Sequence, residues 1–435
     1  MKKTMLLAIG LVVALSLVLT ACAQPTPVPP TSAPKPAEAT KAPAQPTPVP
    51  PTAAPQAKAV HLVLWTKEGA SQLDKVNELA KQFTEKNPNI TIEVINYDVE
   101  KLRENFQTSM LAGQGPDLLW TVNDHAGPFT TAGLIMPVDD LGFDMKAFLP
   151  GALEAVKLNG KTWGIPLSAG NHLMLLYNKS MVKEPPKDTD ELIKVAKELT
   201  KGDVVGLAYN MTEPFWLVPW LGGYGGQVFD KDGKPSLNTD AMKKTLKLLY
   251  DFTNTEKITP KECDYNCTDS LFKDGKAAMI INGDWSLGDY SKALGDKLGT
   301  APIPKISGAD WPKPYTSGIY FMFPKGLAGD KLEAAKKFVN FILSDEVQLG
   351  YVKSDKRLPA IAKLYSDKSL TDDPILKGSA EDLSHGTGMP PQAAMRCNWD
   401  AMKPQMQDVL AGKTTVDAAA AAMQSAAEKC VAELK

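Results

Sequence analysis

VHLVLWTKEGASQLDKVNELAKQFTEKNPNITIEVIN, residues 60–96, sets the fold class, because it reads as a strand, a helix and a second strand. Residues 60–65 are a short, largely apolar run that is typical of a buried strand. We expect Ser71 to cap the helix, in which apolar residues recur every three or four positions until Pro88 ends it. Residues 90–95 alternate between apolar and polar side chains. The stretch therefore predicts a β-α-β unit.

The same alternation continues along the chain. A second helix is expected up to about Ala112 and a third strand at 117–122. Repeated β-α-β units predict an α/β fold with mainly parallel sheets covered by helices. In such sheets ligands bind beyond the carboxyl ends of the strands, often between domains. Later elements are expected at 240–253 (helix), 277–281 (strand), 331–343 (helix) and 415–434 (helix).

The amino terminus indicates export. Lys2 and Lys3 precede an apolar stretch that is too short to span a bilayer comfortably, and small residues follow it. Residues 1–21 are therefore predicted to be a lipoprotein signal peptide, with Cys22 as the acylated first residue. An uncleaved anchor with a chance cysteine is the alternative. The predicted location is extracytoplasmic, lipid-anchored to the cell membrane.

A proline-, alanine- and threonine-rich segment follows, from 22 to 59. AQPTPVPPT occurs at 23–31 and again at 44–52. Such a composition buries too little apolar surface to offset its ordering entropy, and proline favours extended polyproline II. We expect this segment to be a disordered, semi-rigid tether that holds a globular body away from the membrane.

The composition of the body limits its partners. Residues 1–59 carry five lysines and one glutamate, so the remainder has a formal charge of −6 against −2 for the whole chain. The only arginines are Arg103, Arg357 and Arg396. Nucleic-acid binding favours basic patches and phosphate recognition favours arginine, so neither kind of partner is expected. The length is sufficient for two lobes.

Four cysteines remain after Cys22. In an oxidising compartment they are expected to form disulfides, and three connectivities are possible. We prefer Cys263–Cys267 with Cys397–Cys430. A metal site is the alternative, but a pair of cysteines with three residues between them and no nearby histidine is a weak zinc signal.

Four motifs carry a family resemblance. They are GQGPDLLWTVNDHAGPFTTAGLI (113–135), NGKTWGIPLSAGNHLMLLYNKSM (159–181), TEPFWLVPWLGGYGGQVFD (212–230) and FKDGKAAMIINGDWSLGDY (272–290). In this order they resemble the maltose/maltodextrin-binding proteins of bacterial ABC importers, and the resemblance covers nearly all of residues 60–435.

The resemblance implies a two-lobe periplasmic-binding-protein fold, with a mainly parallel sheet in each lobe and hinge strands between them. The hinge crossings are expected near 169–172, 314–318 and 373–378. Closure of the lobes on a ligand is the motion of such proteins. The lobes are predicted to comprise 60–170 with 318–373 (N-terminal lobe) and 171–317 with 374–435 (C-terminal lobe).

A sugar site combines acids, which accept hydrogen bonds from hydroxyls, with aromatic rings, which cover the C–H faces. The resemblance implies that Glu213 and Asp124 accept hydrogen bonds from sugar hydroxyls. It also implies that Phe215 lies against one sugar ring and that Trp285 stacks on another. Trp216 and Trp220 also lie near Glu213, but aromatic residues four apart share a helix face, and we favour a core position for both.

Six further residues complete the predicted ligand-binding set. His125 occupies the place of a basic family residue, and Thr121 that of a stacking tryptophan, which puts one subsite in doubt. The set also contains Trp65, Glu68, Asn171, Tyr224 and Trp399; Trp399 is equally compatible with a buried position.

The predicted function is capture of an oligosaccharide, with maltose or maltodextrin as the best guess, and its delivery to the permease subunits of an ABC importer. We expect a monomer without cofactor or metal. A carbohydrate-active enzyme is one alternative, although no nucleophile elbow or metal cluster is visible. The same fold with another ligand, such as a polyamine, is the second, and a purely structural lipoprotein is the third.

Overall fold

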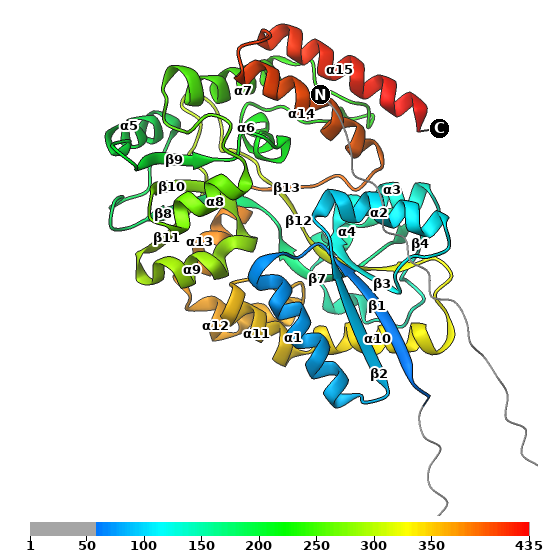
Figure 1. The fold of residues 1–435 in the computed structure, drawn as a ribbon. Coiled ribbons are helices and arrows are strands. Elements are labelled where there is room, and N and C mark those ends of the chain that lie inside the picture. Colours follow the sequence, from blue (N-terminus) through cyan, green and yellow to red (C-terminus); the bar gives the residue numbers. More distant parts are fainter. Residues whose placement is uncertain (1–57, 435) are drawn as a thin grey trace, which may run out of the picture. The chain divides into compact units, whose positions relative to one another are not determined.

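The computed structural model describes residues 58–434, and the chain divides into a unit of residues 1–56 and a compact unit of residues 57–435. The predicted signal peptide, the predicted acylation site Cys22 and nearly all of the tether lie outside the described residues. Strands and helices alternate along the second unit (Figure 1).

The β-α-β unit predicted for residues 60–96 is confirmed. It consists of β1 (Val60–Thr66), α1 (Ala70–Lys86) and β2 (Ile90–Asn96), and the two strands pair in parallel. The helix begins earlier than expected, with Gly69 at the N-cap instead of Ser71. The correction is local, because the apolar face of α1 still packs on the sheet through Val76, Leu79 and Phe83.

The first lobe is built on a seven-stranded sheet with the central order β13-β12-β3-β1-β2, while β4 and β7 also pair with β12. β3 is parallel to β1, whereas β12 runs antiparallel to β3, β4 and β7. The remaining strands of this sheet are β3 (Leu118–Val122), β4 (Ile135–Met136), β7 (Ile165–Gly170), β12 (Tyr315–Pro324) and β13 (Thr387–Gly388). Its helices are α2 (Val99–Leu111), α3 (Ala126–Thr131), α4 (Pro150–Glu154), α10 (Gly329–Ile342) and α11 (Asp345–Asp355), and a short hairpin is formed by β5 (Lys157–Leu158) and β6 (Lys161–Thr162).

The second lobe is built on a four-stranded sheet with the order β11-β8-β10-β9. The strands are β8 (Leu173–Asn178), β9 (Val205–Tyr209), β10 (Ala277–Gly283) and β11 (Leu298–Ala301). The helices are α5 (Thr189–Leu199), α6 (Val218–Gly223), α7 (Asp240–Tyr250), α8 (Tyr265–Lys273), α9 (Leu287–Leu294), α13 (Pro374–Leu383), α14 (Ala394–Leu410) and α15 (Val416–Glu433), and α12 (Lys368–Thr371) lies between α11 and α13 in the chain.

The second sheet corrects the expectation of mainly parallel pairing. β9 and β10 are parallel, but β8 is antiparallel to both β10 and β11. The reason is the route of the chain: β8 begins only two residues after β7, at the edge where β10 ends, and Leu173 pairs with Gly283. A strand that starts beside the end of its neighbour must run antiparallel to it.

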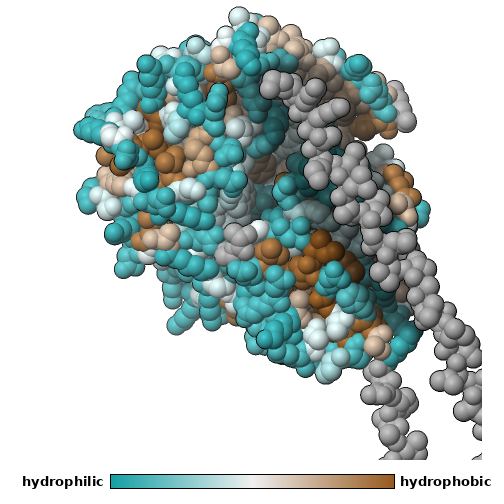
Figure 2. Space-filling view, in the orientation of Figure 1, coloured by the Kyte–Doolittle hydropathy of each residue, from teal (hydrophilic) through white to brown (hydrophobic). Residues whose placement is uncertain are grey.

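Each sheet has its own hydrophobic core. Trp120 and Phe321 pack edge to face in the first lobe, and Trp220 and Phe252 do so in the second. A hollow separates the two lobes on the face shown in Figure 2. The two preferred disulfides are both present: Cys263–Cys267 at the start of α8, and Cys397–Cys430, which ties α14 to α15.

The first connection between the two sheets, from β7 to β8, depends on the backbone conformation of Gly170 and on the buried carboxylate of Asp284. Gly170 has φ of 111°, and a Cβ at this position would lie 2.2 Å from Asp284 Oδ2. The next residue, Asn171, donates its backbone N–H to the same oxygen at 3.0 Å and its side-chain amide to Ser317 of β12 at 3.2 Å. The turn therefore requires both the left-handed conformation and the absence of a side chain at Gly170.

Candidate ligand-binding site

A wall of aromatic rings forms where β9 and β10 end. Phe215 lies in a 3₁₀ turn (Pro214–Trp216) after β9, and Trp285 lies in another (Asp284–Ser286) directly after β10. The two strands are parallel, so their carboxyl ends share one edge and the two rings approach to 6.1 Å. Trp399 of α14 completes the wall, 6.3 Å from Phe215. All three side chains are half-buried, so each keeps an accessible part.

A buried layer behind this wall keeps it rigid. Trp216 packs edge-on against Trp285 and donates its indole N–H to the carbonyl of Ile281 at 2.9 Å. Trp285 itself donates to the hydroxyl of Tyr265 at 3.2 Å. Buried indole groups that find such partners have little freedom to rotate. The wall is thus preorganised.

The core position favoured for Trp216 and Trp220 is confirmed. Trp220 is fully buried and donates to the hydroxyl of Tyr209 at 2.8 Å, while Trp216 is 7% exposed. Their roles differ, however, because Trp216 touches both Phe215 and Trp285 and Trp220 packs on Phe252.

Two acids lie next to the aromatic wall. Asp124 follows β3 of the first lobe, and its carboxylate accepts a hydrogen bond from the indole of Trp399 at 3.3 Å. This contact joins the two lobes directly. Glu213 follows β9 and pairs with Lys403 of α14, and both side chains remain more than 40% exposed. The carboxylate of Glu213 is therefore exposed enough to accept a hydrogen bond from a ligand hydroxyl.

Burial, and after it the nearby charge of Glu100, raise the pKa of Asp124 to about 6, although the indole N–H of Trp399, the backbone N–H of Asp124 and the charge of Arg396 act to lower it. The carboxyl is therefore poised to gain or lose a proton close to neutral pH. A hydroxyl that donates to it favours the ionised form.

Glu68 and His125, both predicted as ligand contacts, are buried inside the first lobe. Glu68 is 2% exposed and accepts hydrogen bonds from Arg357 at 2.7 Å and from the indole of Trp120 at 3.1 Å. Burial alone would raise the pKa of Glu68, but the charges of Arg357 and Lys67 outweigh it and hold the pKa well below its usual range. Glu68 is thus the anion of a buried ion pair.

His125 is turned inward in a similar way. Its Nδ1 lies 2.8 Å from the hydroxyl of Thr121 and its ring packs on Phe129. Burial, followed by the charges of Arg103 and Arg396, lowers the pKa of His125 to about 3, so the imidazole is neutral. Thr121 is also fully buried, so Thr121 and His125 form a polar pair inside the first lobe.

The remaining three predicted residues lie apart from the aromatic wall. Trp65 is 6% exposed and packs edge-on against Tyr97. Asn171 has φ of 49°, and its side-chain amide donates a hydrogen bond to Ser317 between the two sheets. Tyr224 has Lys244 of α7 6.0 Å from its ring.

Three residues that the sequence analysis did not name belong to this region. Tyr315, the first residue of β12, packs edge-on against Trp399 at 6.1 Å. Lys403 pairs with Glu213, and Gln72 of α1 donates from the first lobe to the carbonyl of Trp285 at 2.8 Å. The position of Lys403 four residues after Trp399 was a usable signal, because residues four apart share a helix face. Gln72 carried none.

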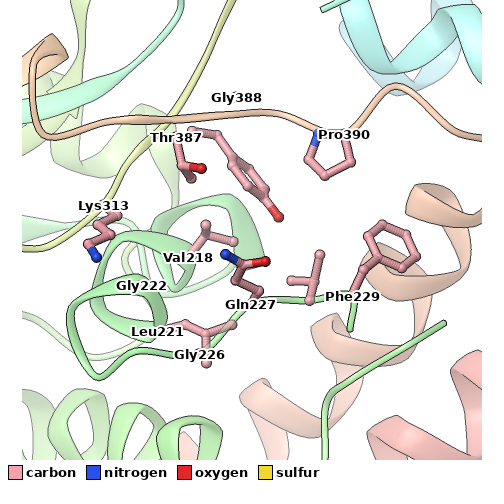
Figure 3. A pocket seen from close by; sticks show the side chains of 12 residues that line it. Val218, Leu221, Gly222, Gly226, Gln227, Phe229, Lys313, Thr387, Gly388 and Pro390 are labelled. Atoms are coloured by element: carbon pink, nitrogen blue, oxygen red, sulfur yellow. The ribbon is translucent and has the colours of Figure 1, made fainter. Parts of the chain in front are cut away.

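A small cavity of about 60 Å³ opens beside Tyr315 (Figure 3). Gln227 and Thr387 direct polar groups into it, and Phe229 and Pro390 form apolar walls (Figure 3). Such a volume suits ordered water or a small group rather than a ring.

Within residues 58–434 there is no group of three or more His, Cys, Asp or Glu side chains that could hold a metal ion. Over the same residues, no helix is both long and apolar enough to span a bilayer. The arrangement that remains consists of aromatic rings and Glu213 on the second lobe facing Asp124 on the first, which is the arrangement of a protein that binds a ligand between two lobes.

The comparisons with known proteins agree with this class. Residues 78–378 match the bacterial extracellular solute-binding protein family. The maltotriose-binding protein of Pyrococcus abyssi is 28% identical over 364 residues, which cover 80% of this chain and 77% of that protein.

Solved structures are similar over most of the chain. The maltose/maltodextrin-binding domain from Bdellovibrio bacteriovorus, bound to maltotriose, is 36% identical with a TM-score of 0.82 and covers 86% of this chain and 100% of its own. The maltotriose-binding protein of Thermus thermophilus, also bound to maltotriose, is 26% identical with a TM-score of 0.78 and covers 85% and 100%. The chain belongs to the bacterial extracellular solute-binding protein family, and it has the two-lobed α/β fold of these structures.

Proposed function

We propose that this protein captures a neutral oligosaccharide, with maltose or a short maltodextrin as the first candidate, and delivers it to the permease subunits of an ABC importer. The observation that carries the proposal is the wall of Phe215, Trp285 and Trp399, which faces Asp124 from the opposite lobe. Rings match the C–H faces of sugars, and carboxylates match their hydroxyls. Relatives named for maltotriose and maltodextrin binding support the choice of ligand.

The proposed site is smaller than the predicted set. Its direct contacts are Phe215, Trp285, Trp399, Asp124 and Glu213. Lys403 orients Glu213 and Tyr315 extends the wall. Trp65, Asn171 and Tyr224 are proposed as peripheral contacts, whereas Glu68 and His125 support the first lobe from within.

The proposed mechanism is a shift between open and closed lobes. A ligand that contacts both lobes binds the closed state more tightly and therefore raises its population. We place the lobe boundaries at 60–170 with 318–373 and at 171–317 with 374–435. We further propose that Cys22 carries the lipid, that residues 22–59 tether the protein to the membrane and that it acts as a monomer without turnover of its ligand.

Calorimetric titration of the chain without residues 1–22 tests the proposal. The panel is maltotriose, maltose, trehalose, sucrose, cellobiose, xylobiose and spermidine. We expect tight binding of maltotriose and weak or no binding of cellobiose. Binding of spermidine alone would contradict a sugar ligand, and release of smaller sugars from a bound oligosaccharide would point to an enzyme.

A further inference from the structure

A second cavity, of about 440 Å³, lies in the second lobe away from the aromatic wall. Its lining comes from the loop before α5, the end of β11, the segment after β11 and α13, and it includes Pro185, Lys187, Lys305, Trp311 and Glu381. None of its lining residues belongs to the proposed site. Its volume falls within the range of small-molecule sites.

Trp311 is the aromatic residue in the lining of this cavity, and contacts with neighbouring residues fix its position. One face of its ring stacks on His385 with the centroids 4.4 Å apart and the planes 13° apart. Its backbone N–H is bound by Asp310 Oδ1 at 2.9 Å, within a turn closed by Ile306 and Asp310. One face of the half-buried ring is thus covered by His385, and Trp311 is one of the residues that line the cavity.

The walls around Trp311 are rigid. The backbone N–H of Lys305 donates to the carbonyl of Lys187 at 3.0 Å, and the N–H of Thr189 donates to the carbonyl of Lys305 at 2.9 Å, so two wall segments are locked together. Pro185, Pro186 and Pro302 also line the cavity, and proline has a fixed φ. A site built from such segments loses little entropy when a ligand binds.

The charged groups at the rim are balanced. Lys187 and Lys305 are opposed by Asp188 and Glu381. Asp188 caps α5 through Oδ1, and within residues 58–434 the side chains of Lys187, Lys305 and Glu381 have no ion-pair or hydrogen-bond partner. Two carboxylates disfavour an anion and two ammonium groups disfavour a cation, so a neutral ligand with many hydroxyls fits best.

We propose that this cavity is a second carbohydrate-binding site, which takes a pyranose unit of a neutral saccharide independently of the cleft. The exposed side of Trp311 covers a C–H face of the sugar, while the lysines donate to its hydroxyls and Glu381 accepts from them. The inference goes beyond the proposed function, because it requires a second bound sugar per chain.

Fluorine NMR of the chain carrying 5-fluorotryptophan separates the two sites. The sequence contains eight tryptophans, and single Trp→Phe variants assign the resonances of Trp285 and Trp311. Maltotriose, cellotriose and xylotriose are the probes. We expect the Trp311 resonance to shift at higher sugar concentrations than the Trp285 resonance, and to shift equally in Trp285→Ala. The double variant Lys187→Ala/Glu381→Gln is expected to weaken the effect at Trp311 by at least about fivefold and to leave Trp285 unchanged.

Three results would overturn the proposal. The first is a Trp311 resonance that stays fixed at saturating concentrations of all three sugars. The second is a shift at Trp311 that follows the Trp285 curve and disappears in Trp285→Ala, because it would report only occupation of the cleft. The third is a response to a proline-rich peptide but to no sugar. A response at Trp311 without one at Trp285 would instead contradict the proposed function and retain this site.

Discussion

Trp285 is the residue of the proposed site that contacts both the aromatic wall and the first lobe. Its ring meets Phe215 and Trp216, and its carbonyl is held by Gln72 from the other lobe. Trp285→Ala is expected to weaken maltotriose binding by about 1 kcal/mol or more, or roughly fivefold, because stacking area is lost. Calorimetry measures the change.

The control for Trp285→Ala is Trp163→Ala. Trp163 packs in the first lobe and donates to the carbonyl of Leu158 at 3.0 Å, so its loss tests general destabilisation alone. Equal affinities of Trp285→Ala and wild type would remove Trp285 from the site.

If Asp124 contacts the sugar as proposed, we expect sugar binding to depend on pH. Its pKa in the free protein is raised to about 6 by burial and by Glu100, and a hydroxyl that donates to the carboxylate lowers the pKa in the complex. Affinity is therefore expected to be full at about pH 7 and above and to fall as the pH drops through 6 towards 5, because the carboxyl must release a proton before the ligand binds. Titrations from pH 7.5 to 5 measure the effect.

Asp124→Asn is the matched variant for the pH experiment. It keeps the shape of the side chain and removes the titrating carboxyl. Its affinity for the sugar should therefore be lower at neutral pH and should not change between pH 7.5 and pH 5. A wild-type affinity that does not change between pH 7 and pH 5 would mean that Asp124 does not contact the ligand in its ionised form.

At the scale of the elements, the disulfide between α14 and α15 supports the helix pair that carries Trp399. Cys397 and Cys430 are separated by 33 positions, whereas Cys263 and Cys267 are separated by four. By loop-closure entropy the longer loop contributes about 4 kcal/mol and the shorter one about 2 kcal/mol. Replacing Cys397 and Cys430 with alanine should therefore lower the free energy of unfolding by more than the same change at Cys263 and Cys267.

Urea unfolding of the two double variants makes this comparison. The short-loop pair serves as the control, because both variants lose one disulfide and two sulfur atoms. A larger loss for Cys263→Ala/Cys267→Ala would contradict the loop-length argument. The sugar affinity of the two variants then separates an effect on Trp399 from one on overall stability.

At the scale of the whole molecule, contacts between the lobes set the closed state. Glu100 of α2 pairs with Arg396 of α14, next to the contact between Asp124 and Trp399. Half-exposed ion pairs contribute modestly, so Glu100→Gln is expected to weaken maltotriose binding by about 0.5 kcal/mol, or roughly twofold, mostly through faster release. The difference should vanish at high salt.

Glu104→Gln is the control for Glu100→Gln. Glu104 pairs with Lys101 on the same helix at 2.8 Å and does not bridge the lobes. An equal effect of the two substitutions would show that general charge, and not the bridge between the lobes, is responsible. Stopped-flow experiments measure the rate at which each variant releases maltotriose.

The elements of the chain were predictable because their signals are local. The apolar periodicity of residues 60–96 and the apolar run at 277–281 are read within one element, and both agree with the structure. Ser71 was misjudged because either residue can occupy an N-cap and only the backbone decides between it and Gly69. The antiparallel pairing of β8 depends on the route of the chain between the lobes, which no local pattern contains.

By itself, the sequence determined the α/β class, the order of the elements and the residue types of a sugar site, since period and composition are properties of neighbouring residues. The tertiary structure alone decided which acids are accessible. Glu68 and Asp124 both follow strands of one sheet, yet Arg357, 289 positions from Glu68, pairs with the first, and Trp399, 275 positions from Asp124, contacts the second. The energy of a carboxylate depends on the charges and burial around it, and those neighbours come from distant parts of the chain.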